Sequence, residues 1–76
     1  EANKGLALQV VAKHYGVRQE EVLAIGDSYN DLDMILWAGT GVAMANARPE
    51  VKDVADYITK SNDEHGVAEA LRKYVL

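Results

Sequence analysis

Apolar residues recur along the chain at two alternating spacings, one helical and one typical of buried strands. In residues 4–15 they follow the i, i+3, i+4, i+7 pattern of an amphipathic helix, whose apolar face is expected to contain Ala7, Val10, Val11 and His14. Asn3 is the expected N-cap of this helix, and Gly16 stands where a helix end favours left-handed backbone. The continuous apolar run 22–25 ends at Gly26 and predicts a short strand buried on both faces.

The same alternation continues along the chain. Residues 31–38 are expected to form a second helix, with one side formed by Leu32, Ile35 and Leu36. The sequence Gly39-Thr40-Gly41 is expected to break this helix, and residues 42–44 are expected to form a second buried strand. Pro49 fits the first turn of a third helix, whose apolar residues are Val51, Val54 and Ala55.

A third strand and a fourth helix complete the pattern. Residues 57–59 combine aromatic and β-branched character and predict the strand, and Ser61 and Glu64 have the spacing of a capping box before the helix. The apolar face of this helix is expected to contain Val67, Ala70, Leu71 and Tyr74. Helices and strands that alternate with short connections predict an α/β fold with about three parallel strands flanked by helices. In such sheets, ligands bind beyond the carboxyl ends of the strands.

Composition narrows the class of protein. The 76 residues suffice for one small domain, and 12 acidic against 8 basic side chains give a net charge of −4, which argues against nucleic-acid and anionic-membrane partners. There is no cysteine for a disulfide or a thiolate metal site, and no apolar run approaches the roughly 20 residues of a membrane span. The cytoplasm is the expected compartment. The chain starts at Glu1 without a methionine, so we expect a processed protein or a piece of a longer one.

The residues with candidate chemistry follow the most apolar strand, in Gly26-Asp27-Ser28-Tyr29-Asn30-Asp31. This segment places two carboxylates and a carboxamide at the ligand edge of the sheet, and such hard oxygen ligands suit Mg²⁺. Asp, Ser and Asn are also ordinary turn and N-cap residues, so a purely structural role stays open. Asn46 and Arg48 follow the second strand on the same side, where a turn role is expected and a phosphate or leaving-group contact is the alternative.

Five segments of the chain carry motifs in a fixed order, at residues 3–8, 26–31, 42–47, 55–59 and 64–68. Together they resemble motifs of the haloacid dehalogenase (HAD) superfamily, with the Cof-type sugar phosphatases as the best fit. The segment from Gly26 to Asp31 resembles its G-D-x-x-N-D motif. Residues 3–8 resemble the K-G-x-A-L start of the preceding helix, and residues 42–47 resemble the G-V-A-M-x-N-A segment. Residues 55–59 and 64–68 resemble the A-D-x-V-T and D-G-V-A segments near the C-terminus of the family. The resemblance covers essentially the whole chain and implies a partial Rossmann-like HAD core.

The resemblance also implies roles for four residues. Asp27 is expected to ligate Mg²⁺ directly, and Asp31 to support the metal through a coordinated water. Asn30 is expected to bind the phosphoryl oxygens of the substrate. Lys4 is expected to be a catalytic residue that pairs with the phosphate and with a nucleophilic aspartate. The implied substrate is a phosphorylated small molecule such as a sugar phosphate, hydrolysed through an aspartyl-phosphate.

Other motifs of the family are absent. The D-x-D-x-[TV] nucleophile strand, the phosphate-binding Ser or Thr motif and the cap domain have no counterpart, since the one D-x-D, at Asp31 and Asp33, lies in a predicted helix. We therefore expect residues 1–76 to be the C-terminal part of a HAD core, inactive alone, with strand 22–25 left with an unpaired edge that promotes self-association. A non-catalytic α/β interaction or weak Mg²⁺- or phosphate-binding module is the alternative. A phosphomutase or a P-type ATPase phosphorylation domain is a third possibility.

Overall fold

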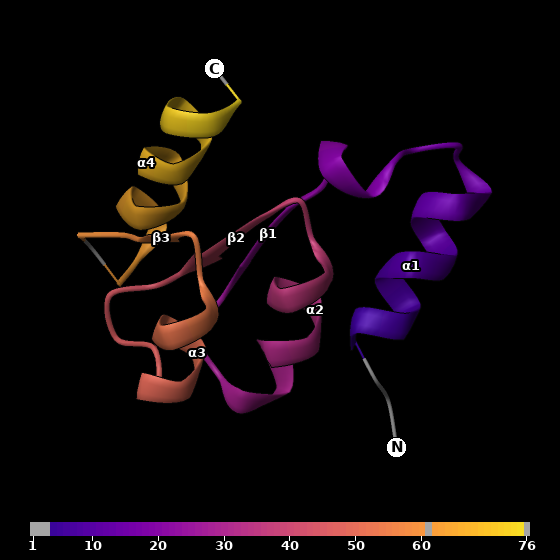
Figure 1. Ribbon diagram of the computed structural model, residues 1–76. Helices are drawn as coiled ribbons and strands as arrows, with labels where there is room; N and C mark the ends of the chain where they lie inside the picture. Colours follow the sequence, from indigo (N-terminus) through magenta and orange to yellow (C-terminus); the bar gives the residue numbers. More distant parts are fainter. Residues whose placement is uncertain (1–3, 61, 76) are drawn as a thin grey trace.

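The computed structural model describes residues 4–60 and 62–75, and its elements follow the predicted order (Figure 1). The helices are α1 (Lys4–His14), α2 (Leu32–Trp37), α3 (Pro49–Val54) and α4 (Glu64–Tyr74). The strands are β1 (Leu23–Gly26), β2 (Thr40–Ala43) and β3 (Tyr57–Ile58), and short 3₁₀ turns span Gln19–Glu21 and Tyr29–Asp31. Gly16 after α1 has a φ of 68°, which confirms the predicted left-handed helix end.

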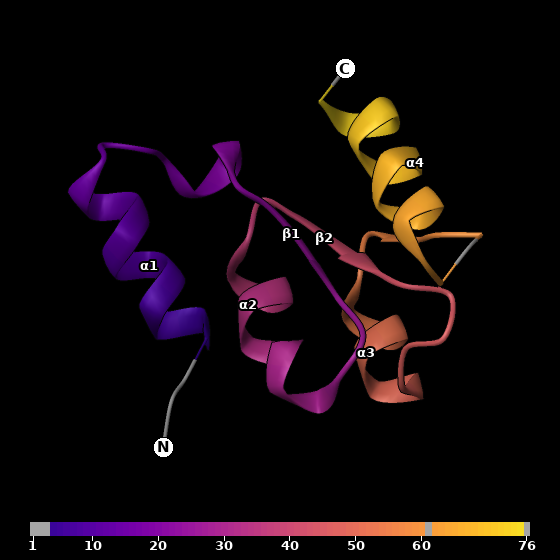
Figure 2. The same cartoon turned by 180° about the vertical axis from the view of Figure 1, so that it is seen from behind.

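The three strands form one parallel sheet in the order β1-β2-β3, as predicted (Figures 1 and 2). In its register Leu23 lies opposite Thr40, and Val42 lies opposite Tyr57. β2 begins two residues before its predicted start, because Gly41 belongs to the strand. A Cβ atom at Gly41 would lie 2.5 Å from the backbone oxygen of Ile35, so this glycine permits close packing of α2 on the strand. The helix ends at Trp37, before Gly39-Thr40-Gly41, as predicted.

The sheet lies between two helical layers. α2 and α3 lie on one side of the strands and α4 on the other in both views (Figures 1 and 2). On the α2 and α3 side, the buried core consists of Ile35, Ala43, Ala47 and Val51. On the other side, Tyr57 packs against α4 through its contacts with Glu69 and Tyr74. The helical layers thus cover the two faces of the sheet, and ligands in folds of this type bind beyond the carboxyl ends of the strands.

α1 packs on α2 and not on the sheet, and its predicted inner face is wrong. Gly5 and Ala12 are its buried residues, whereas Val10 and Val11 are 66% and 51% exposed. The reason is a close approach between the two helices: a Cβ atom at Gly5 would lie 2.8 Å from the Cβ atom of Asp33. Gly5 and Ala12 lie seven positions apart on one helical face, with the half-buried Leu8 between them, while Val10 and Val11 project to solvent.

Three further predictions need correction or fall outside the description. Leu36, expected on the inner side of α2, is 56% exposed, while its neighbour Ile35 is 2% exposed. Asp63 is the N-cap of α4, because its carboxylate accepts a hydrogen bond from the backbone N–H of His65 at 2.9 Å. The predicted caps Ser61 and Asn3 lie outside the described residues.

None of the helices within residues 4–60 and 62–75 is long and apolar enough to cross a bilayer.

β1 forms an edge of the sheet, since among the described residues it pairs with β2 alone. Its free backbone groups can pair with a strand of another chain. Self-association of the 76-residue chain therefore stays a prediction. Analytical ultracentrifugation over a concentration series is expected to show a rise in sedimentation coefficient with concentration. A single monomer species together with a sharp unfolding transition would contradict it.

Candidate active site

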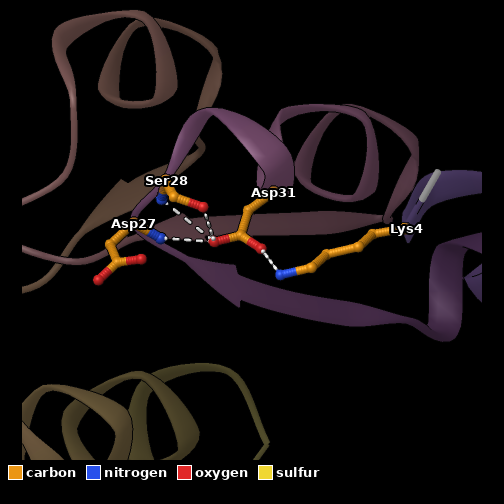
Figure 3. Close-up of polar contacts among 4 residues, drawn as sticks. All are labelled: Lys4, Asp27, Ser28 and Asp31. Atoms are coloured by element: carbon orange, nitrogen blue, oxygen red, sulfur yellow. Dashed lines mark hydrogen bonds and ion pairs between the residues drawn. The ribbon is translucent and has the colours of Figure 1, made fainter. Parts of the chain in front are cut away.

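The segment after β1 is organised around the buried carboxylate of Asp31, which is 6% exposed. Its Oδ2 atom accepts hydrogen bonds from the backbone N–H of Asp27 at 3.0 Å and of Ser28 at 3.1 Å (Figure 3). The Ser28 hydroxyl donates to the same oxygen at 3.2 Å. These three hydrogen bonds close the turn between β1 and α2, so the carboxylate at its end fixes the backbone that carries Asp27.

An ion pair joins this turn to the start of the chain. Lys4, the first residue of α1, places its Nζ atom 2.6 Å from Oδ1 of Asp31, 27 positions away in the sequence (Figure 3). The Lys4 side chain is 52% exposed and that of Asp31 is 8% exposed. Asp31 therefore positions the ammonium group of Lys4, whose side chain remains half exposed to solvent. This ion pair lies at the edge of the sheet where ligands bind in parallel sheets.

The electrostatics of Asp31 favour its charged form. Burial alone raises the pKa of this carboxyl, but the hydrogen bond from Lys4, the backbone N–H groups of Ser28 and Asp27 and the charge of Lys4 together outweigh burial. The net result is a pKa below the ordinary value of 3.8. Asp31 is thus an anion held by four donors.

The lowered pKa of Asp31 predicts a loss of stability in acid. Because the folded pKa lies below the ordinary 3.8, the contribution of this carboxylate is complete above that value and is lost as pH falls through the folded pKa. Urea unfolding at a series of pH values is expected to show this decrease in the parent chain and less of it in Asp31→Asn. The exposed Asp33→Asn variant serves as the control. Identical acid profiles for Asp31→Asn and the parent chain would contradict the ion pair.

Gly26 is required by the position of Asp31. A Cβ atom at residue 26 would lie 2.5 Å from Cβ and 2.6 Å from Oδ2 of Asp31, which is far inside van der Waals contact. Because Gly26 has no side chain, the Asp31 carboxylate can pack directly against the backbone at the end of β1. This packing gives a physical reason for the glycine that precedes Asp27 in the sequence motif.

Asp27 differs from Asp31 in being free to bind a ligand. Its side chain is exposed and points away from Asp31 and Lys4 in Figure 3, and among the described residues none donates a hydrogen bond to its carboxylate. Its backbone is fixed on both sides, since its N–H bonds to Asp31 and its carbonyl accepts from the N–H of Arg48 at 3.2 Å. A rigidly placed, unpaired carboxylate is the hard oxygen donor that Mg²⁺ prefers.

The donor set fits a magnesium ion that shares its coordination with water and substrate. The described part of the chain contains no group of three or more residues able to ligate a metal by themselves. Mg²⁺ commonly takes one or two protein carboxylates and keeps several waters. The Oδ2 atom of Asp31 already accepts three hydrogen bonds, whereas Oδ1 accepts one, which leaves Oδ1 able to accept another from a water.

The structure brings together some of the predicted site residues and not others. Lys4 and Asp31 are in direct contact, and Asp27 joins them through its backbone. Asn30 lies in the same turn and is exposed, without a hydrogen bond to Lys4, Asp27 or Asp31. The sequence predicts Ser28 only as a turn or N-cap residue, and the structure adds its backbone N–H and hydroxyl to the donors on Asp31, at the three-residue spacing of a capping interaction.

Nearly the whole chain, including the segment that carries Asp27 and Asp31, is similar to known proteins. A family model described as haloacid dehalogenase-like hydrolase matches residues 1–71. The chain is 54% identical over 74 residues to the 5-amino-6-(5-phospho-D-ribitylamino)uracil phosphatase YcsE of Bacillus subtilis, covering 97% of this chain and 30% of that protein. It matches the crystal structure of a haloacid dehalogenase-like hydrolase from Bacteroides thetaiotaomicron with a TM-score of 0.89 and 58% identity, covering 93% of this chain and 27% of that one.

A third comparison concerns a solved HAD subclass IIB sugar phosphatase. The chain matches it with a TM-score of 0.87 and 37% identity, covering 93% of this chain and 27% of that one. The chain thus spans less than a third of the length of each of these three relatives.

Proposed function

Because the chain belongs to the haloacid dehalogenase-like hydrolases, we propose that residues 1–76 are the C-terminal part of a phosphatase core domain. In this proposal the chain supplies the metal- and phosphate-binding half of the site, and the nucleophilic aspartate and the cap domain lie on other parts of the enzyme. The substrate is a phosphorylated small molecule, such as a sugar phosphate, as the names of the relatives suggest. The 76-residue chain alone is expected to be inactive.

The observation that carries the proposal is a difference in burial and hydrogen bonding between two neighbouring carboxylates. The carboxylate of Asp27 is exposed and has no hydrogen-bond partner in the described residues, whereas the carboxylate of Asp31 is buried and accepts four hydrogen bonds. A turn that served structure alone would need Asp31 and Ser28 but would have no use for the free carboxylate of Asp27. We propose Asp27 as the direct Mg²⁺ ligand and Asp31 as its support through water.

The remaining roles follow from charge. An aspartate that attacks a phosphate dianion meets like-charge repulsion, which Mg²⁺ bound beside it would offset. Lys4, held at one end by Asp31, presents a second positive charge toward the phosphoryl group. The carboxamide of Asn30 is exposed in the same turn and can donate hydrogen bonds to phosphoryl oxygens. The proposed reaction is hydrolysis of a phosphomonoester through an aspartyl-phosphate on the nucleophile.

The test is an assay of the full-length enzyme that contains this chain. Hydrolysis of p-nitrophenyl phosphate is expected to require Mg²⁺, to stop with EDTA and to return when Mg²⁺ is added. Lys4→Ala is expected to lower kcat by about tenfold or more, because a charge-assisted contact to the phosphoryl group is lost. Lys13→Ala, at the other end of α1, is the matched control and is expected to leave kcat unchanged. Unchanged kcat in Lys4→Ala would contradict the proposed role.

A further inference from the structure

The loop between β2 and α3, residues 44–48, lies against the segment that carries Asp27. The backbone N–H of Met44 donates to the carbonyl of Gly26 at 2.9 Å, and that of Arg48 donates to the carbonyl of Asp27 at 3.2 Å. Both ends of the loop are therefore anchored to consecutive residues at the carboxyl end of β1. Asn46 occupies the middle of this loop and so lies at the same edge of the sheet as Asp27.

The loop is also held by Thr59, the residue that follows β3. Ala45 donates its backbone N–H to the Oγ1 atom of Thr59 at 3.1 Å, and Ala47 donates to the carbonyl of Met44 at 2.9 Å. Thr59 is 3% exposed, and Met44 and Ala47 are buried as well. With both ends and its interior bonded to neighbours, the loop has a fixed conformation.

The side chain of Asn46 takes no part in this bonding. It is exposed, and nowhere in residues 4–60 and 62–75 does a group hydrogen-bond to its carboxamide. Asn46 lies in a turn, as expected from the sequence, because the backbone N–H of Ala47 donates to the carbonyl of Met44 at 2.9 Å. Its side chain makes no hydrogen bond to the backbone of that turn, so the carboxamide stays available. Arg48 is directed elsewhere, since its Nε atom lies 3.8 Å from Oε1 of Glu50 in α3. The rigid loop thus places the exposed carboxamide of Asn46, which makes no hydrogen bond within the described residues, at the ligand edge of the sheet.

We propose that Asn46 is a specificity residue that hydrogen-bonds a hydroxyl group in the leaving-group part of the substrate. The proposal rests on the phosphatase function above. A neutral carboxamide both donates and accepts hydrogen bonds, which matches a hydroxyl group. The anionic phosphoryl group binds more strongly to cations, here the ammonium group of Lys4 and a metal at Asp27. A site that bonds a substrate hydroxyl discriminates against esters that lack it.

Steady-state kinetics of Asn46→Ala in the full-length enzyme test this role. The substrates are a panel of sugar and polyol monophosphates, and p-nitrophenyl phosphate, whose leaving group has no free hydroxyl. For the best hydroxylated ester, kcat/KM is expected to fall about tenfold, mostly through KM, as for the loss of one hydrogen bond. For p-nitrophenyl phosphate it is expected to stay within threefold, and the inhibition constant of inorganic phosphate is expected to be unchanged. Gln9→Ala, which removes an exposed carboxamide from α1, is the control.

The outcomes separate this proposal from the function on which it rests. If the parent enzyme is active but Asn46→Ala weakens both kinds of ester equally, or neither, the specificity role is overturned. If the parent enzyme hydrolyses no phosphomonoester, the proposed function fails and this inference falls with it.

A second pair of variants tests whether the loop positions Asn46. Thr59→Val removes the acceptor for the N–H of Ala45 at nearly constant volume, whereas Thr59→Ser keeps a hydroxyl. Thr59→Val is expected to raise KM for the hydroxylated ester severalfold, with p-nitrophenyl phosphate unaffected and Thr59→Ser close to the parent. An equal loss for both esters in Thr59→Val would instead show general destabilisation and overturn the positioning role.

Discussion

The Asp27→Asn variant of the full-length enzyme is expected to lose phosphomonoester hydrolysis by about a hundredfold or more while its stability is unchanged. The loss follows because the amide lacks the negative charge that holds the metal, whose electrostatic contribution is worth several kcal/mol. Stability is retained because the Asp27 carboxylate is exposed and has no hydrogen-bond partner among the described residues. The backbone bonds of residue 27 to Asp31 and Arg48 persist in the variant. The measurements are kcat at saturating Mg²⁺ and the midpoint of urea unfolding.

A matched carboxylate provides the control. Asp33 lies in α2, is also exposed, and projects to the α1 side, where its Cβ atom is beside Gly5. Asp33→Asn removes the same charge from the same segment and is expected to leave both kcat and the unfolding midpoint unchanged. If Asp27→Asn and Asp33→Asn have equal activities, Asp27 is not the metal ligand.

The Gly26→Ala variant is expected to lose about 1–3 kcal/mol of stability, the usual cost of forcing an extra methyl group into a packed site. The added Cβ would lie 2.5 Å from Asp31, so either the carboxylate or the strand has to move. Displacement of Asp31 would break its hydrogen bonds to the turn and its ion pair with Lys4. Urea unfolding of the 76-residue chain measures the loss, and hydrolysis by the full-length variant is expected to fall with it.

A second glycine separates this steric effect from the general effect of replacing glycine. A Cβ atom at Gly16 would meet nothing within 4 Å, although the φ of 68° there disfavours a side chain. Gly16→Ala is therefore expected to cost about 1 kcal/mol through backbone strain alone and to leave hydrolysis unchanged. A Gly26→Ala chain as stable and as active as the parent would contradict the close packing of Asp31 on β1.

The order of elements could be predicted from the sequence because it depends on local periodicity and on turn residues. Pro49 begins α3 as predicted, and the alternation of periods gives the parallel sheet. The packing of α1 could not be predicted, because the pattern of large apolar residues does not reveal that α1 approaches α2 at Gly5 and buries Gly5 and Ala12. Close approach through small residues depends on a partner helix elsewhere in the chain, here with Asp33 lying 28 positions after Gly5, and no local pattern encodes it.

The candidate site shows the same limit. The sequence located Asp27, Asn30 and Asp31 at the ligand edge, and the resemblance added Lys4. Residue spacing alone treats the two carboxylates alike, since both are acidic residues beside a strand end, and the resemblance implied a direct metal role for Asp27 and a water-mediated one for Asp31. The three-dimensional arrangement supplies a physical difference between them: the Asp31 carboxylate is buried and accepts four hydrogen bonds, and the Asp27 carboxylate is exposed. Burial and the saturation of hydrogen bonds are properties of the fold, so sequence spacing alone does not reveal them.

The central claim, that Asp27 and not Asp31 is the direct metal ligand, is tested most directly by paramagnetic broadening. Mn²⁺ added at low ratio to the ¹⁵N-labelled full-length protein is expected to broaden the amide signals of Asp27 and Ser28 first, and Mg²⁺ is expected to reverse the effect. The broadening is expected to disappear in Asp27→Asn and to persist in Asp33→Asn. Broadening centred on another acidic segment, or unchanged in Asp27→Asn, would contradict the assignment of the metal site.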